Sequence, residues 1–176
     1  TFKIVTAVAG IEEGIVNSSY GVVCDGAFRF PNSTDLVYCA NRYGHGYMNV
    51  VNGIANSCND FFGQVAYDLG TDSNGQFSDS LGMEMLTKYT EMFRLNENTG
   101  LEIEEATPEM ATTDVVRSSI GQSDANYTTS QLARYVTTIA SRGTSYDLTL
   151  FDKVTDADGN VLEDYSPEVK GDMDVS

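Results

Sequence analysis

The strongest constraint on the fold is the stretch 48–69, in which apolar side chains recur every three or four positions. That spacing places them on one face of an α-helix. The run Asn56–Asp60 interrupts the pattern with four poor helix formers. The sequence therefore predicts two helices with a break between them, the second capped by a serine or an asparagine of this run. The apolar positions are Met48, Val51, Ile54, Ala55, Cys58, Phe61, Phe62, Val65, Ala66 and Leu69.

The rest of the chain predicts further helices, with strands near the end. Periodicity and capping signals decide both assignments. The helices are expected over 1–14, over 83–95, as a short helix or turn over 114–121, and from a cap at Thr128 or Thr129 to Arg142-Gly143. Short strands are expected at Tyr20–Cys24 and Leu36–Cys39 inside an irregular region, 15–43, and a hairpin turn at Asp156–Asn160. The overall pattern is a helical block followed by the first strands of a sheet.

Composition excludes several classes of protein. The chain has 176 residues, 41% of them hydrophobic, which is enough to bury a core. Its formal net charge of −16 repels both a phosphate backbone and an anionic membrane surface. No apolar run is long enough for a membrane-spanning helix, and the first residues do not resemble a signal peptide. The chain should therefore be an acidic globular protein.

Two of the three cysteines and the single histidine are candidate metal ligands. Cys24, Cys39 and His45 are the residue types that hold zinc, and Asp25 or Asp60 could complete such a site. Their spacing lacks the short C-x-x-C pattern that makes a zinc prediction specific. From the residues alone, buried thiols beside a hydrogen-bonded histidine are the favoured interpretation.

Lys3, Ser57 and Asn59 are candidates for proton transfer and for binding a carbonyl group. A hydroxyl and an amide two residues apart at a helix N-terminus can relay a proton and hydrogen-bond a substrate. The competing interpretation is a serine N-cap, a turn asparagine and a solvated surface lysine. Taken one at a time, these residues favour the structural interpretation.

Their order along the chain carries a resemblance that no single residue does. Five stretches, taken in this order, resemble the transpeptidase domains of penicillin-binding proteins, most closely the high-molecular-mass class B enzymes. They are Thr1-Phe2-Lys3 running into an alanine-rich helix that ends at Glu12-Glu13-Gly14, Gly44-His45-Gly46, Ser57-Cys58-Asn59 with 61–70 behind it, Thr99–Glu102, and Ile120–Asp124 ahead of Gln131-Leu132-Ala133.

The resemblance implies an α/β (α+β) fold of the serine β-lactamase and penicillin-binding-protein type, with a helical block packed on an antiparallel sheet. Residues 1–176 would form a partial transpeptidase domain, incomplete at both ends. The family motifs are S-x-x-K, S-x-N and K-T-G. The nucleophilic serine would stand immediately before Thr1, Lys3 would accept its proton, Ser57 would pass a proton to the leaving amine, and Asn59 would hold the substrate amide.

The sequence also departs from the family pattern. Lys170-Gly171-Asp172 has the wrong order for K-T-G, Ser123 stands where the family usually has glycine, and Thr129 stands where it commonly has proline. Without the nucleophile and K-T-G, the chain as given is expected to be inactive.

The implied activity is that of a bacterial peptidoglycan D,D-transpeptidase, which cross-links stem peptides through a serine acyl-enzyme and is acylated by β-lactams. Its partners would be D-Ala-D-Ala stem peptides, β-lactams and the cell-wall synthesis machinery, on the extracytoplasmic face of the membrane and held by an anchor outside this segment. No cofactor is required. The resemblance nevertheless strengthens the case for a structural zinc at Cys24, Cys39 and His45, because some class B relatives carry zinc nearby.

Three alternatives remain at this point. A non-catalytic domain that binds or senses β-lactams or stem peptides would share the motifs but would not need K-T-G. A serine β-lactamase fits less well, because no deacylating base is evident. An acidic adhesion or interaction domain would explain the charge but not the ordered motifs.

Overall fold

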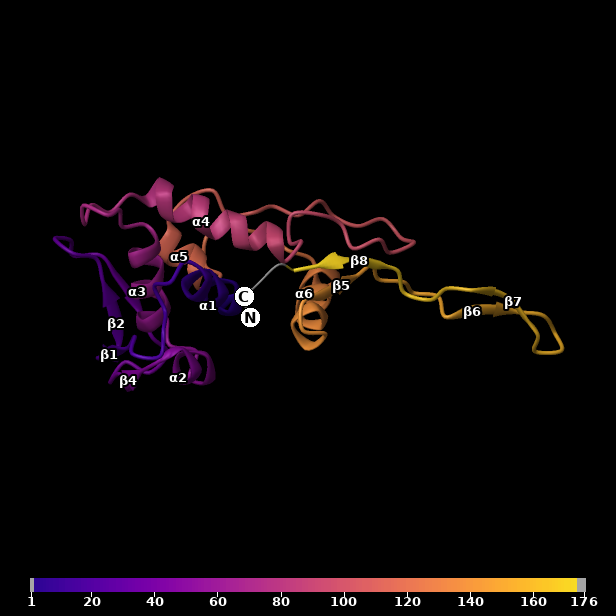
Figure 1. Cartoon of the computed structure of the whole chain (residues 1–176), viewed down its shortest axis with the longest axis horizontal. Helices are drawn as coiled ribbons and strands as arrows, with labels where there is room; N and C mark the ends of the chain where they lie inside the picture. The colour runs from indigo at the N-terminus through magenta and orange to yellow at the C-terminus, as the bar shows by residue number, and fades with distance from the viewer. Residues whose placement is uncertain (1, 174–176) are drawn as a thin grey trace. The chain divides into compact units, whose positions relative to one another are not determined.

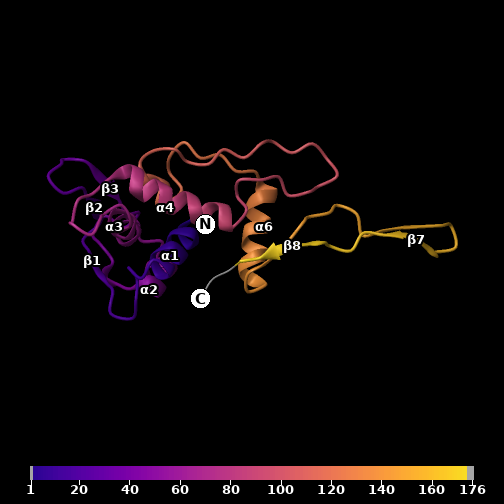
Figure 2. The ribbon, with the colours of Figure 1, turned by 45° about the horizontal axis from the view of Figure 1, so that its top comes forward.

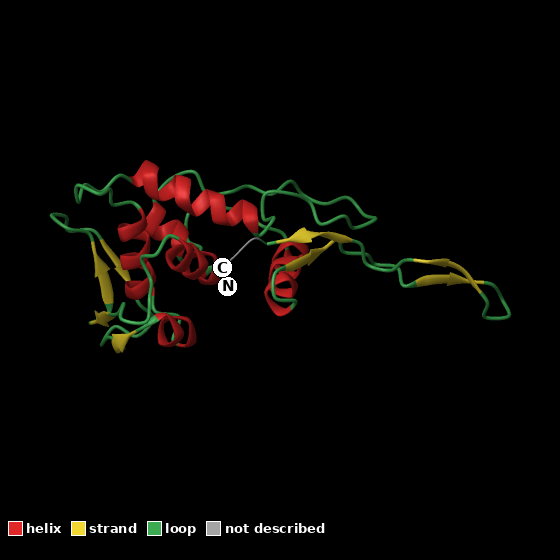
Figure 3. Cartoon of the chain, viewed as in Figure 1, coloured by secondary structure: helices red, strands yellow, loops and turns green. Residues whose placement is uncertain are grey.

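The computed structural model of the protein describes residues 2–173. In that range the chain forms six helices and eight short strands, which pair into four two-stranded antiparallel sheets (Figures 1 and 3). The chain divides into two compact units: Thr1–Thr90 with Met110–Ala125, and Glu91–Glu109 with Asn126–Ser176. Within the described range, no helix combines the length and the apolar character needed to span a bilayer.

The first unit is built around one buried helix, α3 (Asn59–Leu69). Phe61, Phe62 and Val65 of α3 have no exposed surface. Figure 2 shows α3 end-on, with α1 on one side and the strands on the other, and α1, α5 and β2 all pack against it. The other helices of this unit are α1 (Lys3–Glu12), α2 (Val50–Ala55), α5 (Val115–Ser119) and most of α4 (Asp79–Met92).

The predicted break between two helices is confirmed, but the predicted cap was wrong. α2 ends at Ala55 and α3 begins at Asn59. Between them, Ser57 lies in the left-handed region of backbone conformation, with a φ of 50°. The cap of α3 is Cys58, whose Sγ accepts the backbone N–H of Phe61 at 3.4 Å. The side chains of Ser57 and Asn59 are thereby free to face Lys3 instead of the helix end.

The region 15–48 contains more strand than the sequence predicts. β1 (Val22–Cys24) pairs with β4 (Gly46–Met48), and β2 (Ala27–Arg29) pairs with β3 (Leu36–Tyr38), both antiparallel. Each strand has only three residues, which is too short for an alternating pattern to be recognised. The sequence predicts one or two of these strands, and the structure has four.

The second unit contains α6 and two strand pairs. α6 (Thr129–Ala140) begins at a capping box formed by Thr128 and Gln131, which confirms the predicted N-terminus of this helix. β6 and β7 form the predicted hairpin around Asp156–Asn160, while β5 pairs with β8. The strands are β5 (Thr144–Tyr146), β6 (Lys153–Thr155), β7 (Val161–Asp164) and β8 (Val169–Asp172).

Candidate active site and metal centre

The structure brings the three predicted active-site residues together. Lys3 Nζ lies 2.7 Å from Ser57 Oγ, 2.6 Å from Asn59 Oδ1 and 2.7 Å from the Ser57 carbonyl oxygen. Lys3 comes from the first turn of α1, and the other two residues flank the start of α3. Three acceptors around one ammonium satisfy all three of its N–H donors. Of the other two residues of this first stretch, Phe2 is buried and Thr1 lies outside the described range.

Burial lowers the pKa of Lys3. Loss of hydration lowers the pKa of Lys3 from its ordinary value of 10.5, and the nearby sulfurs of Cys39 and Cys58 oppose that shift. The ring of Phe62 contributes to the burial, with its centroid 5.9 Å from Nζ. A lysine with a lowered pKa is neutral more often near neutral pH, and the neutral amine can accept a proton.

Asn59 is held by a backbone group that sequence reasoning missed. Its Nδ2 donates a 2.7 Å hydrogen bond to the carbonyl oxygen of Tyr38, the last residue of β3. Because the amide nitrogen is engaged there, the Asn59 carbonyl oxygen faces Lys3. A backbone carbonyl carries no signal in the sequence, so only the fold could show this contact.

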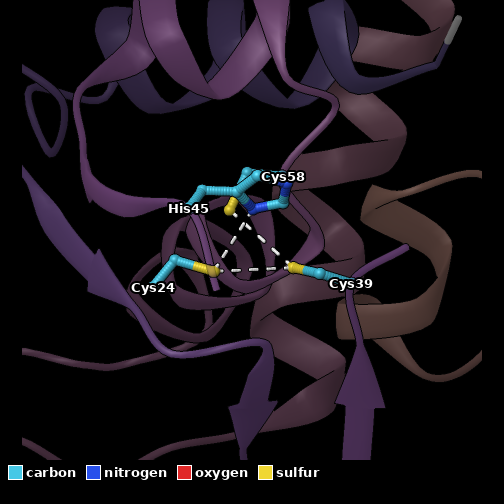
Figure 4. A group of neighbouring side chains, drawn as sticks. All are labelled: Cys24, Cys39, His45 and Cys58. Atoms are coloured by element: carbon cyan, nitrogen blue, oxygen red, sulfur yellow. Dashed lines mark hydrogen bonds between the residues drawn. The ribbon is translucent and has the colours of Figure 1, made fainter. Parts of the chain in front are cut away.

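Three thiols and one imidazole meet directly beside this site. Figure 4 shows Cys24, Cys39, His45 and Cys58 converging, and their ligand atoms all lie within 4.8 Å of one another. Cys24 Sγ is 3.7 Å from Cys39 Sγ and 3.4 Å from His45 Nδ1, and Cys39 Sγ is 3.9 Å from Cys58 Sγ. All three cysteines are buried and unlinked by disulfides. We call these four residues the Cys₃His cluster.

The fourth member of the Cys₃His cluster corrects the sequence prediction. Asp25 is exposed and pairs with Arg29 at 2.6 Å, which directs its carboxylate away. Asp60 contacts the cluster through its N–H, which donates to Cys39 Sγ at 3.4 Å, and through its carboxyl group, which is hydrogen-bonded with the Cys24 thiol. Among the described residues, its carboxylate does not belong to the group of ligand atoms that converge. Cys58 takes the fourth position. Cys58 was not predicted as a ligand because it fits the apolar spacing of the helical stretch.

Two glycines allow the loops to approach closely enough to form the Cys₃His cluster. Gly44 has a φ of 86°, and a Cβ there would lie 2.4 Å from the Cys24 carbonyl oxygen. Gly26 has a φ of 112°, and a Cβ there would lie 2.3 Å from the Arg42 carbonyl oxygen. Glycine is therefore required at both positions, and the first of these contacts places His45 beside Cys24.

The donor set of the Cys₃His cluster fits a tetrahedral zinc ion. Three cysteine sulfurs and one histidine nitrogen form a common structural zinc site, with Zn–S distances of about 2.3 Å. Tetrahedral geometry then separates the sulfurs by roughly 3.8 Å, close to the observed 3.7 and 3.9 Å. The same residues would hold the metal through Sγ atoms and His45 Nδ1.

The later family stretches form structural contacts. Asp124 accepts hydrogen bonds from the Thr112 backbone and hydroxyl groups and from Ser123, which together lower the pKa of its carboxyl to about 2. Ser123 also donates to the Thr113 carbonyl oxygen at 3.0 Å, so the serine is accommodated where the family usually has glycine. Lys170-Gly171-Asp172 lies in β8, and the Lys170 ammonium is 3.3 Å from Asp147.

A cavity of about 300 Å³ lies in the second unit. Acidic side chains, including Glu102, Asp147 and Glu163, line much of it. None of the predicted catalytic or metal-binding residues is among its lining residues. Cavity volume therefore does not locate the candidate active site in this chain.

The fold and the first-unit geometry define a class of protein. A lysine in the first turn of one helix, bonded to a serine and an asparagine that flank the start of a second helix, is the arrangement of the S-x-x-K and S-x-N motifs in serine acyl transferases that recognise penicillin. The chain belongs to the penicillin-binding protein transpeptidase family, because the model of the penicillin binding protein transpeptidase domain matches residues 1–176.

Individual relatives agree with this assignment. The chain is 29% identical over 82 residues to the peptidoglycan D,D-transpeptidase MrdA of Escherichia coli K12, covering 47% of this chain and 13% of MrdA. A chain from a solved peptidoglycan synthase complex that coordinates polymerization and crosslinking superposes with a TM-score of 0.78 at 25% identity, covering 96% of this chain and 28% of that one. The penicillin G acyl-enzyme of Mycobacterium tuberculosis penicillin-binding protein A superposes at 0.76 and 18% identity, covering 99% and 39%.

The predicted family and fold class are thus confirmed, with helices and antiparallel strands as expected. The chain spans about an eighth of the length of MrdA and less than two fifths of the two solved chains. The catalytic roles of Lys3, Ser57 and Asn59 stay predictions.

Proposed function

We propose that residues 1–176 are part of the transpeptidase domain of a peptidoglycan D,D-transpeptidase. The observation that carries the proposal is the set of three hydrogen bonds from Lys3 Nζ to Ser57 and Asn59. The substrate would be the D-Ala-D-Ala end of a stem peptide, and the nucleophile a serine immediately before Thr1. The name of MrdA, a peptidoglycan D,D-transpeptidase, supports this activity.

The geometry suggests a route for the proton. Neutral Lys3 takes the proton of the nucleophilic serine as its oxygen attacks the penultimate D-Ala carbonyl carbon. The hydroxyl of Ser57, 2.7 Å from Lys3 Nζ, then gives its proton to the departing amine and receives the one held by Lys3. The C–N bond breaks, free D-Ala leaves, and a serine ester remains. An amine from a second stem peptide attacks this ester, and the same protons move in reverse.

Asn59 has a different part in this scheme. With its amide nitrogen on the Tyr38 carbonyl and its oxygen on Lys3, the side chain is fixed at both ends. In this scheme Asn59 would orient the lysine and hydrogen-bond a substrate amide. A β-lactam would acylate the same serine, and the ring nitrogen would stay tethered to the acyl group. The M. tuberculosis penicillin G acyl-enzyme supports this extension.

We also propose that a structural zinc ion binds at Cys24, Cys39 and His45, with Cys58 as the fourth ligand. The convergence of the four ligand atoms within 4.8 Å supports it. The ion would cross-link the loops that carry its ligands, and it would take no part in the chemistry of acyl transfer. Metal analysis of chelator-free protein tests this directly: about one zinc per chain is expected, and a background level would overturn the zinc proposal.

The cellular setting follows from the same assignment. The protein would work on the extracytoplasmic face of the bacterial membrane, within the machinery that builds the cell wall. The similarity to a chain of a peptidoglycan synthase complex supports such a partnership.

Covalent labelling by a fluorescent penicillin tests the proposed function. The test uses the full-length protein and its Ser57→Ala and Asn59→Ala variants, with Asn52→Ala, an exposed position on α2, as the matched control. Labelling should be strong in the unaltered protein and in the control, and weak in the two active-site variants. A folded full-length protein that takes up no penicillin would exclude the enzyme and favour a non-catalytic binding module.

A further inference from the structure

Asn59 is held between two backbone segments, and each segment carries a member of the Cys₃His cluster. On one side, Cys58 directly precedes Asn59. On the other, Cys39 directly follows Tyr38, whose carbonyl oxygen accepts the Asn59 amide at 2.7 Å. The two sulfurs are 3.9 Å apart. The two segments that hold Asn59 therefore also meet at the cluster.

The Cys58 segment has a conformation that needs support. Ser57 adopts a φ of 50°, which is unfavourable for a residue other than glycine. Cys58 is fully buried, and its Sγ accepts the Phe61 N–H at 3.4 Å as the cap of α3. This one side chain thus anchors the turn that presents both Ser57 and Asn59 to Lys3.

The Cys39 segment contacts the first turn of the same helix, α3. Cys39 Sγ accepts the backbone N–H of Asp60, the residue after Asn59, at 3.4 Å. Its own N–H donates to the Gly26 carbonyl oxygen at 2.9 Å. Hydrogen bonds to neutral thiols are weak, so without a metal the sulfur contacts add little to the packing of β2 and β3 on α3 and to the bond between Asn59 and the Tyr38 carbonyl.

We propose that the Cys₃His cluster, when it binds a metal ion, positions Asn59 for the acylation step, with Cys39 and Cys58 as positioning residues. Metal–sulfur bonds to both cysteines fix the Tyr38 carbonyl relative to the start of α3. The Asn59 amide is then held with its oxygen on Lys3, and the lysine is aimed at the nucleophile. This inference rests on the proposed function and on the proposed zinc site.

A double-mutant cycle tests the proposal in the full-length protein. The second-order rate constant for fluorescent penicillin is measured with metal bound and after chelation, in the unaltered protein and in Asn59→Ala. Metal removal should slow acylation at least tenfold in the unaltered protein but less than twofold in Asn59→Ala, where the group that the metal positions is absent. The variant Leu86→Ala, in the buried core of α4, controls for general loss of stability and should retain its rate when it is folded.

A second measurement follows the metal instead of the reaction rate. Cobalt(II) substituted for zinc gives sulfur-to-metal charge-transfer absorption, and acylation by penicillin G should shift these bands because the acyl group engages Asn59. The shift should be absent from Asn59→Ala after incubation long enough for covalent labelling to be complete.

Each failure has a distinct meaning. Equal losses of rate in both backgrounds, together with a cobalt spectrum unchanged by acylation, would overturn the positioning proposal and leave the zinc site standing. Protein isolated without metal that regains no metal would overturn the zinc site and this inference together. Metal-loaded protein that takes up no penicillin would overturn the proposed function, and the inference would fall with it.

Discussion

Asn59 Oδ1 accepts a 2.6 Å hydrogen bond from Lys3 Nζ, although 56 positions separate the two residues in the sequence. Together with the two contacts from Ser57, this bond saturates the protonated lysine. When the lysine loses its proton, it has only two N–H donors and gains a lone pair. The neutral amine can keep two of these acceptors and take a proton from a hydroxyl group. The arrangement thus accommodates both states of the lysine that the proposed acyl transfer would require.

Replacing Lys3 should remove most of the reactivity toward penicillin. Loss of a general base typically costs about 10²- to 10⁴-fold in rate, so Lys3→Ala in the full-length protein should fall within that range. Lys3→Arg should be equally slow, because a guanidinium stays protonated. The control is Lys88→Ala, which removes a lysine paired with Glu13 on the surface. Its rate should stay within twofold. An active Lys3→Arg enzyme would contradict the role of general base.

The acylation rate should rise with pH, with a midpoint below the ordinary lysine value of 10.5. Only the neutral amine accepts a proton, and its fraction grows as the pH approaches the pKa of Lys3 from below. Burial lowers that pKa, so the rising limb moves to lower pH. The measurement is the rate constant for a fluorescent penicillin between about pH 6 and 11, with unfolding followed at each pH. A midpoint at or above 10.5 in folded protein would contradict the prediction.

The sequence predicted the grouping of the candidate site residues better than their surroundings. Lys3, Ser57 and Asn59 were predicted together because their order and spacing match family motifs, and the structure brings them into contact. Cys58 was missed as a ligand because its burial and helical spacing already had a sufficient explanation in core packing. The contact with the Tyr38 carbonyl could not be predicted, because every residue has a backbone carbonyl group. Its position depends on the β2–β3 pair, whose three-residue strands are too short to show a period. Contacts made by backbone atoms and by short strands come from the tertiary fold.

Metal removal should make the Cys₃His cluster oxidisable. Cys39 Sγ lies 3.7 Å from Cys24 Sγ and 3.9 Å from Cys58 Sγ, so either partner can join it in a disulfide after a small shift. Oxidised glutathione would take up the two electrons and yield two reduced glutathione molecules. Burial raises the pKa of the Cys24 thiol, which keeps this reaction slow.

Free-thiol titration and peptide mapping check this prediction. Chelated protein should lose two of the three thiols of the Cys₃His cluster, and the cross-linked peptide should contain Cys39. Metal-loaded protein should keep all three, and Cys39→Ser should slow cross-linking after chelation. Oxidation at the same rate with and without metal would mean that the metal does not hold these sulfurs.

In the second unit, Arg134 should contribute strongly to stability. Its side chain is 1% exposed and donates to the carbonyl oxygens of Arg94, Glu97 and Asn98, which belong to the loop after α4. Carboxylates of Glu97 and Asp147 lie 3.8 Å away. Arg134→Met keeps much of the apolar volume but leaves these carbonyl groups without their donor. Unsatisfied buried acceptors cost about 1–3 kcal/mol each, and partial access of water to the loop reduces the sum to about 2–4 kcal/mol.

Urea unfolding of the full-length protein measures the effect of Arg134→Met on the transition of the transpeptidase domain. Arg134→Lys is the matched variant, because it keeps the charge but cannot reach three carbonyl groups with one planar fork. The free energy of unfolding of Arg134→Lys should lie between that of the unaltered protein and that of Arg134→Met. Because Arg134 and the groups it bonds lie in the second unit, metal content should be unchanged in both variants. A domain equally stable with methionine at this position would show that these hydrogen bonds do not hold the loop.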